Sequence, residues 1–134
     1  MRRGPDSRKG ETARHEAAEI VAHATLYLYR PNRFSGADAV VIVASVEPDA
    51  LVAKVKNGAW CRVHYPHVGT CKFMTGVYIR NPEPFHCTLQ PGKTYYLRCS
   101  LHHPGFNMIA RLELVPEEIA ILEITKLKRQ PVNV

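Results

Sequence analysis

The chain has 134 residues, of which 46% are hydrophobic and 22% are charged, and it contains 10 Pro and 8 Gly. These proportions are typical of one globular domain with many turns, and they exclude collagen-like, coiled-coil and wholly disordered chains. The net charge of +6 is spread along the chain, which favours solubility and a weak attraction to anions. The longest apolar run, residues 39–44, is far shorter than the roughly 20 residues of a membrane-spanning helix.

The N-terminal segment differs in composition from the rest of the chain. Residues 1–21 contain no aromatic side chain and many charged ones, which predicts a flexible polar tail. The segment also lacks the apolar stretch and the small-residue cleavage site of a secretory signal. As written, the sequence predicts a cytoplasmic protein, whereas an envelope or periplasmic location would follow if the N-terminus is truncated.

From residue 22 onward, short runs rich in Val, Ile, Tyr, Thr and Leu alternate with turn residues at intervals of about ten residues. This spacing predicts a mainly β protein, an antiparallel β-sandwich of seven or eight strands formed by residues 22–134. The predicted strands lie at 23–30, 39–46, 51–56, 59–65, 70–79, 84–89, 94–101 and 108–115. Asn57-Gly58 predicts a hairpin between two of them, because a type I′ turn needs positive φ at both central residues.

The segment from residue 116 to 129 has a different period. It begins with Pro116 and two glutamates, which suit the first turn of a helix, and it ends in basic residues, which suit the last turn. Ala120, Ile124 and Leu127 place apolar side chains at helical spacing. We therefore expect one C-terminal helix over about 116–129, packed against the sheets or over a sheet edge.

Five segments of the chain, taken in their order, indicate a resemblance to a known family. They are Ala24–Pro31, Leu51–Trp60, Pro66–Thr70, Pro91–Arg98 and Leu112–Ala120. Together they resemble the bacterial family catalogued as domain of unknown function 2846, which is common in small envelope lipoproteins. The resemblance implies an immunoglobulin-like or transthyretin-like sandwich with no established catalytic residue. The chain departs from that family because it has no lipid-accepting Leu-x-Gly-Cys, its first cysteine being Cys61.

Four cysteines, Cys61, Cys71, Cys87 and Cys99, have the same strand phase as neighbouring apolar residues. We expect four inward-pointing, free thiols, since free cysteine behaves as a small hydrophobic residue. An oxidising compartment would allow disulfides, and four cysteines permit three pairings. If one bridge forms, the sequence favours Cys71 with Cys87, because their strands could be neighbours.

Metal and catalytic motifs have little support. Cys61, His64 and His67 have a ligand-like spacing, but residues three apart on a strand face opposite sides. No nucleophile elbow, zinc-protease motif, phosphate-binding loop or dinucleotide-binding glycine pattern occurs. The sequence therefore predicts no catalytic residue, no metal site and no cofactor.

One surface remains as a candidate binding site: Tyr27, Tyr29, Arg30, Tyr96 and Arg98. Tyr27 and Tyr29 share one face of the first predicted strand, and Tyr96 and Arg98 share the outward face of another. If these strands pair, they form an aromatic and basic surface of the kind on which bases of single-stranded nucleic acid stack. Alternatively, the rings cover the core or hold neighbouring strands together as cross-strand pairs.

The expected function is that of a non-enzymatic module that binds another protein. Loops and edge strands of sandwiches are recurrent protein-binding surfaces. Such a module would be an accessory or structural component of a bacterial envelope assembly, or an immunity-type binder. The alternative is an anion- or nucleic-acid-binding module that uses the Tyr/Arg face, although a nucleic-acid partner is the less favoured of the two.

Overall fold

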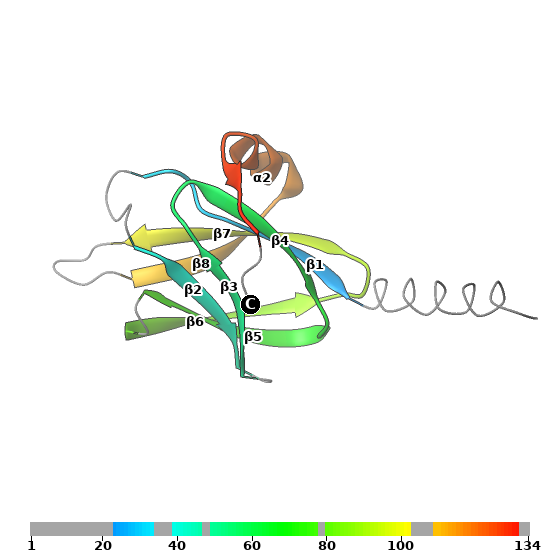
Figure 1. The fold of residues 1–134 in the computed structure, drawn as a ribbon. Coiled ribbons are helices and arrows are strands. Elements are labelled where there is room, and N and C mark those ends of the chain that lie inside the picture. The colour runs from blue at the N-terminus through cyan, green and yellow to red at the C-terminus, as the bar shows by residue number, and fades with distance from the viewer. Residues whose placement is uncertain (1–22, 34–38, 47–48, 78–79, 103–108, 132–134) are drawn as a thin grey trace, which may run out of the picture.

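A computed structural model describes residues 23–33, 39–46, 49–77, 80–102 and 109–131, and the predicted tail at 1–21 lies outside them. Within these residues the chain forms nine strands and one helix (Figure 1). In chain order the elements are β1 Ala24–Tyr29, β2 Val41–Ser45, β3 Ala50–Val55, β4 Ala59–Tyr65, β5 Gly69–Val77, β6 Arg80–Leu89, β7 Thr94–His102, β8 Ile109–Val115, α2 Glu117–Ile124 and β9 Lys128–Arg129.

The strands form two sheets that stack as a sandwich. The five-stranded sheet has the order β8-β7-β1-β4-β9, and the four-stranded sheet has the order β3-β2-β5-β6. Alternation along the strands produces the stacking: in β1, Leu26 and Leu28 are fully buried between the sheets, while Tyr27 points to the outer face. Leu97 of β7 and Val43 and Phe73 of the other sheet complete the centre of this core. The prediction of a mainly β sandwich is confirmed.

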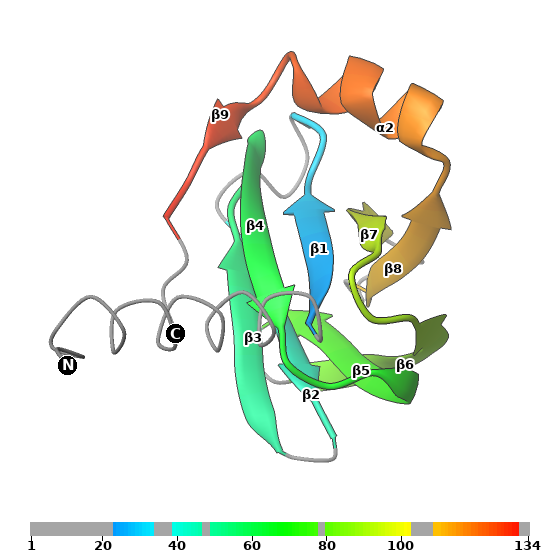
Figure 2. The ribbon, with the colours of Figure 1, turned by 90° about the vertical axis from the view of Figure 1, so that its right-hand side faces the viewer.

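A second, smaller apolar cluster lies on the outer face of the five-stranded sheet. Tyr29, Val115 and Ala120 are buried there, with Ile124 and Leu127 packed against them. Figure 2 shows α2 lying across one end of β1, β7 and β8. The helix therefore covers part of a sheet face that strand alternation alone would leave in solvent.

The strand directions differ from the predicted antiparallel arrangement. β1 pairs with β7 in parallel, and β4 pairs with β9 in parallel, so the five-stranded sheet is mixed.

The predicted helix over 116–129 ends at Ile124, and its last predicted residues form β9 instead. Contacts with β4 outweigh helix propensity there, because Arg129 lies beside Trp60 and its guanidinium stacks over the indole.

The turn at Asn57-Gly58 forms, but the predicted hairpin around it is wrong. β3 belongs to the four-stranded sheet and β4 to the five-stranded one, so the turn is a corner between sheets. Gly58 has φ +70° and its N–H donates to the carbonyl of Arg30. The Asn57 side chain bonds to Asn32 and to the N–H of Arg33. These contacts with the segment after β1 direct the chain into the other sheet.

Candidate functional site

The parallel pairing of β1 with β7 brings most of the predicted surface together. Tyr27 lies opposite Tyr96, and Tyr29 lies opposite Arg98, on the outer face of the five-stranded sheet. Tyr27 and Tyr96 are half-buried, and their rings stack with centroids 5.0 Å apart and planes inclined by 19°. Rings at this distance and inclination cover one another's faces, so the pair holds two strands together.

Two residues that the sequence did not single out extend this row of rings. Trp60 of β4 lies with its ring centroid 5.9 Å from that of Tyr27, and the Arg129 guanidinium lies 5.4 Å from the Trp60 ring. Trp60 and Arg129 were missed because the neighbours of β4 are distant in sequence. The one available signal was an outward-facing tryptophan in an alternating strand. Because much of the ring surface is used within the chain, the row offers little free ring face for stacking with bases.

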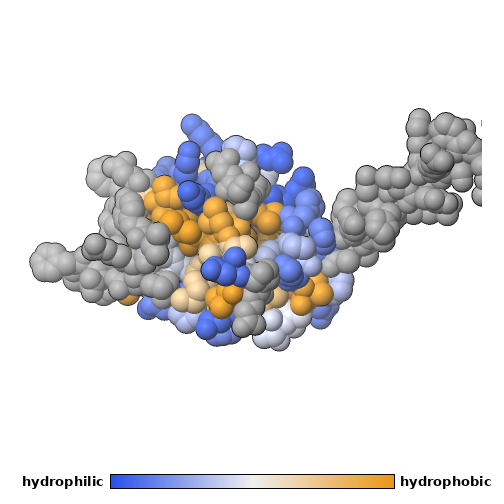
Figure 3. Space-filling view, turned by 60° about the horizontal axis from the view of Figure 1, so that its bottom comes forward, coloured by the Kyte–Doolittle hydropathy of each residue, from blue (hydrophilic) through white to orange (hydrophobic). Residues whose placement is uncertain are grey.

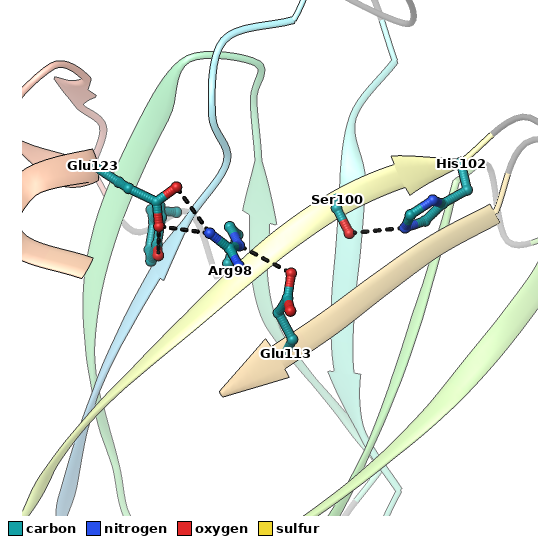
Figure 4. A network of polar contacts seen from close by, with 6 residues as sticks. Arg98, Ser100, His102, Glu113 and Glu123 are labelled. Carbon is teal, nitrogen blue, oxygen red and sulfur yellow. Dashed lines mark hydrogen bonds and ion pairs between the residues drawn. The ribbon is translucent and has the colours of Figure 1, made fainter. Parts of the chain in front are cut away.

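Tyr29 and Arg98 lie under or beside α2 rather than on an open surface, which corrects their predicted exposure. Tyr29 is fully buried, and its hydroxyl donates to Glu123 of α2 at 2.7 Å. Arg98 donates to Glu113 at 2.9 Å and to Glu123 at 2.7 Å, and Figure 4 shows it between these two carboxylates. Burial and the Glu123 carboxylate raise the pKa of Tyr29, so its hydroxyl stays protonated as a donor.

Arg30 is buried as well, with 3% of its surface exposed. Its guanidinium donates to the carbonyls of Ala39 and Val55, which precede β2 and end β3 respectively. Burial lowers the pKa of Arg30, which remains a cation at any ordinary pH. Arg30 therefore joins the end of β1 to the opposite sheet and is not part of a surface.

The four cysteines are free thiols, as the sequence predicted. Cys61, Cys71 and Cys99 are buried and Cys87 is half-buried. Burial raises the pKa of the Cys61 and Cys87 thiols to about 11, which keeps them protonated and unreactive at neutral pH. In the described part of the chain, no group of three or more His, Cys, Asp or Glu side chains could hold a metal ion.

One long side of the sandwich is open, and it carries an apolar cleft of about 260 Å³. The open side consists of the neighbouring edges of β3 and β4 in the two sheets. Its lining comes mainly from apolar and aromatic side chains: Leu51 and Val52 of β3, Val63 and Tyr65 of β4, and Pro66. Gln130 closes one end of the open side. Its side-chain amide donates a hydrogen bond to the carbonyl of Lys54 and accepts one from the N–H of Lys56.

Other apolar side chains are also exposed on the described part of the surface. On α2, the side chains of Ile121 and Leu122 are 46% and 68% exposed. On the outer face of the four-stranded sheet, Ile42 and Met74 are half-buried. Figure 3, in which the side of the four-stranded sheet comes forward, shows hydrophobic surface beside hydrophilic residues. None of these four side chains lines the cleft between β3 and β4.

The chain matches no family model, no curated protein and no solved structure. The resemblance to domain of unknown function 2846, and the immunoglobulin-like or transthyretin-like topology that it implies, therefore remain predictions. In the described residues, no helix combines the length and apolar composition needed to cross a membrane.

Proposed function

We propose that this chain is a non-enzymatic protein-binding module that takes up an extended segment of its partner along the open side. The observation that carries the proposal is the outer edge of β4. β9 pairs with β4 only at Ala59 and Trp60, so the edge from Arg62 to Tyr65 has no neighbouring strand among the described residues. Exposed strand edges bind partner strands through main-chain hydrogen bonds.

The direction of the backbone groups supports strand addition. The N–H of Gln130 donates to the carbonyl of Trp60 at 2.8 Å, so the backbone groups of Trp60 point to the outer edge. Because these groups alternate in direction along a strand, those of Arg62 and His64 point the same way. An added strand would continue the hydrogen bonding that β9 begins.

The apolar cleft supports a peptide as the occupant. Side chains of an added strand would alternate between the outer face and the cleft, which Leu51, Val52 and Val63 line. At about 260 Å³ the cleft is smaller than the roughly 300–1,000 Å³ of typical small-molecule sites. Its size therefore favours a few apolar side chains over a whole metabolite.

The alternative of nucleic-acid binding has weaker support. Tyr27 stacks against Tyr96, Arg129 lies over Trp60, and Arg98 is paired with two carboxylates. Stacking platforms for bases need exposed ring faces beside unpaired cations. Of the basic residues in the predicted surface, Arg30 and Arg98 both bind groups within the chain.

The test begins with a phage-displayed library of random linear peptides, selected against the full chain. Selected peptides are then measured by isothermal titration calorimetry against the native chain and two variants. Val63→Asp places a charge in the cleft, which Val63 lines, whereas Leu122→Asp places the same charge on the exposed face of α2. We expect Val63→Asp, with its fold checked by circular dichroism, to abolish binding and Leu122→Asp to leave it unchanged.

Amide hydrogen exchange locates the bound peptide. The amides of Arg62 and His64 should become protected on binding, because strand addition gives them acceptors. Loss of binding in Leu122→Asp alone would assign binding to α2 and overturn the proposal, as would a selection that enriches no peptide. A dimer of the chain that dissociates in Val63→Asp would also overturn it, because a second copy would then be the occupant.

A further inference from the structure

We infer that the partner segment is acidic as well as apolar: it places carboxylates on the outer side of the β4 edge and apolar side chains in the cleft. This inference rests on the proposed function of the open side. It names the chemistry of the partner, which neither the edge nor the cleft alone specifies. The distribution of charge around the open side points to an acidic segment.

Basic side chains border the open side on both sheets. Arg62 is exposed on β4, Lys54 is exposed on β3, and Lys56 follows β3. Lys128 and Arg129 of β9 continue the same edge of the five-stranded sheet. Mixed surface charges are the usual arrangement, so a border with this excess of cations favours an anionic partner.

The described acidic side chains do not neutralise this border. Glu113 and Glu123 are held by Arg98, and Glu117 and Glu118 lie in the first turn of α2. Glu83 lies in β6, at the other edge of the four-stranded sheet, and Asp49 immediately precedes β3. Apart from Asp49, the described acids therefore belong to other parts of the molecule.

Strand geometry determines where the partner's charges would lie. Residues opposite one another on neighbouring strands share a face of the sheet. The side chain of Arg62 lies on the outer face, opposite Tyr27, whereas that of Val63 lines the cleft. A partner residue opposite Arg62 is therefore placed for a carboxylate, and the residue opposite Val63 is placed for an apolar side chain. The partner sequence should alternate accordingly.

Matched peptides of about seven residues test this arrangement. One alternates Val with Glu, a second alternates Val with Ser, and a third alternates Val with Lys, all with blocked ends. Binding to the full chain is measured by isothermal titration calorimetry at low and high ionic strength. We expect the Glu peptide to bind about tenfold more tightly than the Lys peptide, with the Ser peptide between them, because opposite charges across strands attract and like charges repel. The difference should shrink at about 1 M salt, where exposed charges are screened.

Two variants locate the preference. Arg62→Gln should reduce the preference for the Glu peptide over the Ser peptide, whereas Arg111→Gln should leave it unchanged. Arg111 is a suitable control, because it is exposed on β8 at the opposite edge of the same sheet. An equal effect of both variants would indicate attraction to the net charge of the chain and overturn the placement at β4.

The outcomes separate this inference from the proposed function. Equal affinity for the three peptides, with binding still lost in Val63→Asp, would overturn the acidic partner and leave the protein-binding function standing. If neither these peptides nor any library peptide binds, both proposals are wrong. Tighter binding of the Lys peptide would overturn the acidic partner directly.

Discussion

Cys71 and Cys87 lie directly opposite each other on β5 and β6, and both are free thiols. The carbonyl of Lys72 accepts a hydrogen bond from Val46, so the backbone groups of Lys72 point towards β2. By alternation those of Cys71 point towards β6, which makes Cys71 and Cys87 a hydrogen-bonded pair. Side chains in such pairs lie farther apart than the roughly 3.5–4.5 Å between Cβ atoms that a disulfide needs. Strand geometry thus favours thiols over the bridge that the sequence allowed.

We predict that all four cysteines titrate as thiols after denaturation without reductant. In the native chain they should react slowly at pH about 8, because burial raises the pKa of Cys61 and Cys87 to about 11 and leaves little thiolate. Labelling with a thiol reagent, followed by mass spectrometry, measures both quantities. Fewer than four labels in the denatured chain would reveal a disulfide.

The same pKa shift predicts a loss of stability in alkali. The folded-state pKa of Cys61 is raised from 9.0 to about 11, so its contribution is complete below pH about 9 and is lost as pH rises towards 11. Above pH about 9 the unfolded chain releases a proton that the folded chain retains. The urea midpoint should therefore decrease more between pH about 8 and pH about 10.5 in the unsubstituted chain than in Cys61→Ala. An equal decrease of the midpoint in both proteins would show that the Cys61 thiol does not contribute to the pH dependence of stability.

Helix α2 depends on the sheet beneath it. Its eight residues are too few for a stable isolated helix, and Pro116 provides no side-chain cap. Ala120 packs on the sheet, and Glu123 binds both Arg98 and Tyr29. The ion pair is largely shielded, since Arg98 and Glu123 side chains are 27% and 29% exposed. The helix is therefore held by this polar cluster, by a small apolar contact and by the hydrogen bond that the Tyr96 hydroxyl donates to Glu117.

We predict that Glu123→Gln lowers the free energy of unfolding by about 1–2 kcal/mol, because it weakens charge-assisted hydrogen bonds to Arg98 and Tyr29. The matched control is Glu118→Gln, an exposed glutamate of the same helix, which should change stability by less than about 0.5 kcal/mol. Urea denaturation followed by Trp60 fluorescence measures both variants. Equal effects would show that the cluster does not hold the helix.

The corner between β3 and β4 requires a left-handed residue. Gly58 has φ +70°, at which a β-branched side chain is strained, although a Cβ there would find ordinary space beside Asn32. We predict that Gly58→Val destabilises the chain by roughly 1–3 kcal/mol, while Gly58→Asn costs less, because Asn tolerates this conformation. Urea midpoints of the two variants provide the comparison, and similar midpoints would contradict a conformational cause.

Local patterns predicted the elements better than they predicted the neighbours of those elements. Alternation located eight strands, and Asn57-Gly58 located a turn, because both depend on residues close in sequence. The pattern did not reveal that β3 and β4 belong to different sheets, since Gly58 and Asn57 bond to the segment after β1. Likewise Tyr29 and Arg98 point outward as predicted, yet α2 covers them. Trp60 and Arg129 meet only through the long-range pairing of β4 with β9.

At the scale of the whole molecule, the two long sides of the sandwich differ. On one side β6 and β8 lie in contact across the two sheets. On the other side, Gln130 bonds β9 to the backbone around the end of β3, and the cleft remains open beyond it. Because the closed side holds the two sheets together, we expect the open side to accept the proposed partner segment without separation of the sheets.

A shared core predicts that the two sheets unfold together. Trp60, the single tryptophan, reports on the outer face of the five-stranded sheet. Leu89, 2% exposed, belongs to β6 in the four-stranded sheet and to the core between the sheets. Leu89→Ala should lower stability by about 2–5 kcal/mol, the usual range for a buried leucine.

The measurement is urea unfolding followed by Trp60 fluorescence and by far-ultraviolet circular dichroism. Both probes should give one coincident transition, and Leu89→Ala should shift the two midpoints equally, because unfolding of a single cooperative domain moves every probe together. A variant that shifts circular dichroism but leaves the Trp60 transition in place would show that each sheet unfolds independently. In that case the core between the sheets would not unite residues 22–134 into a single domain.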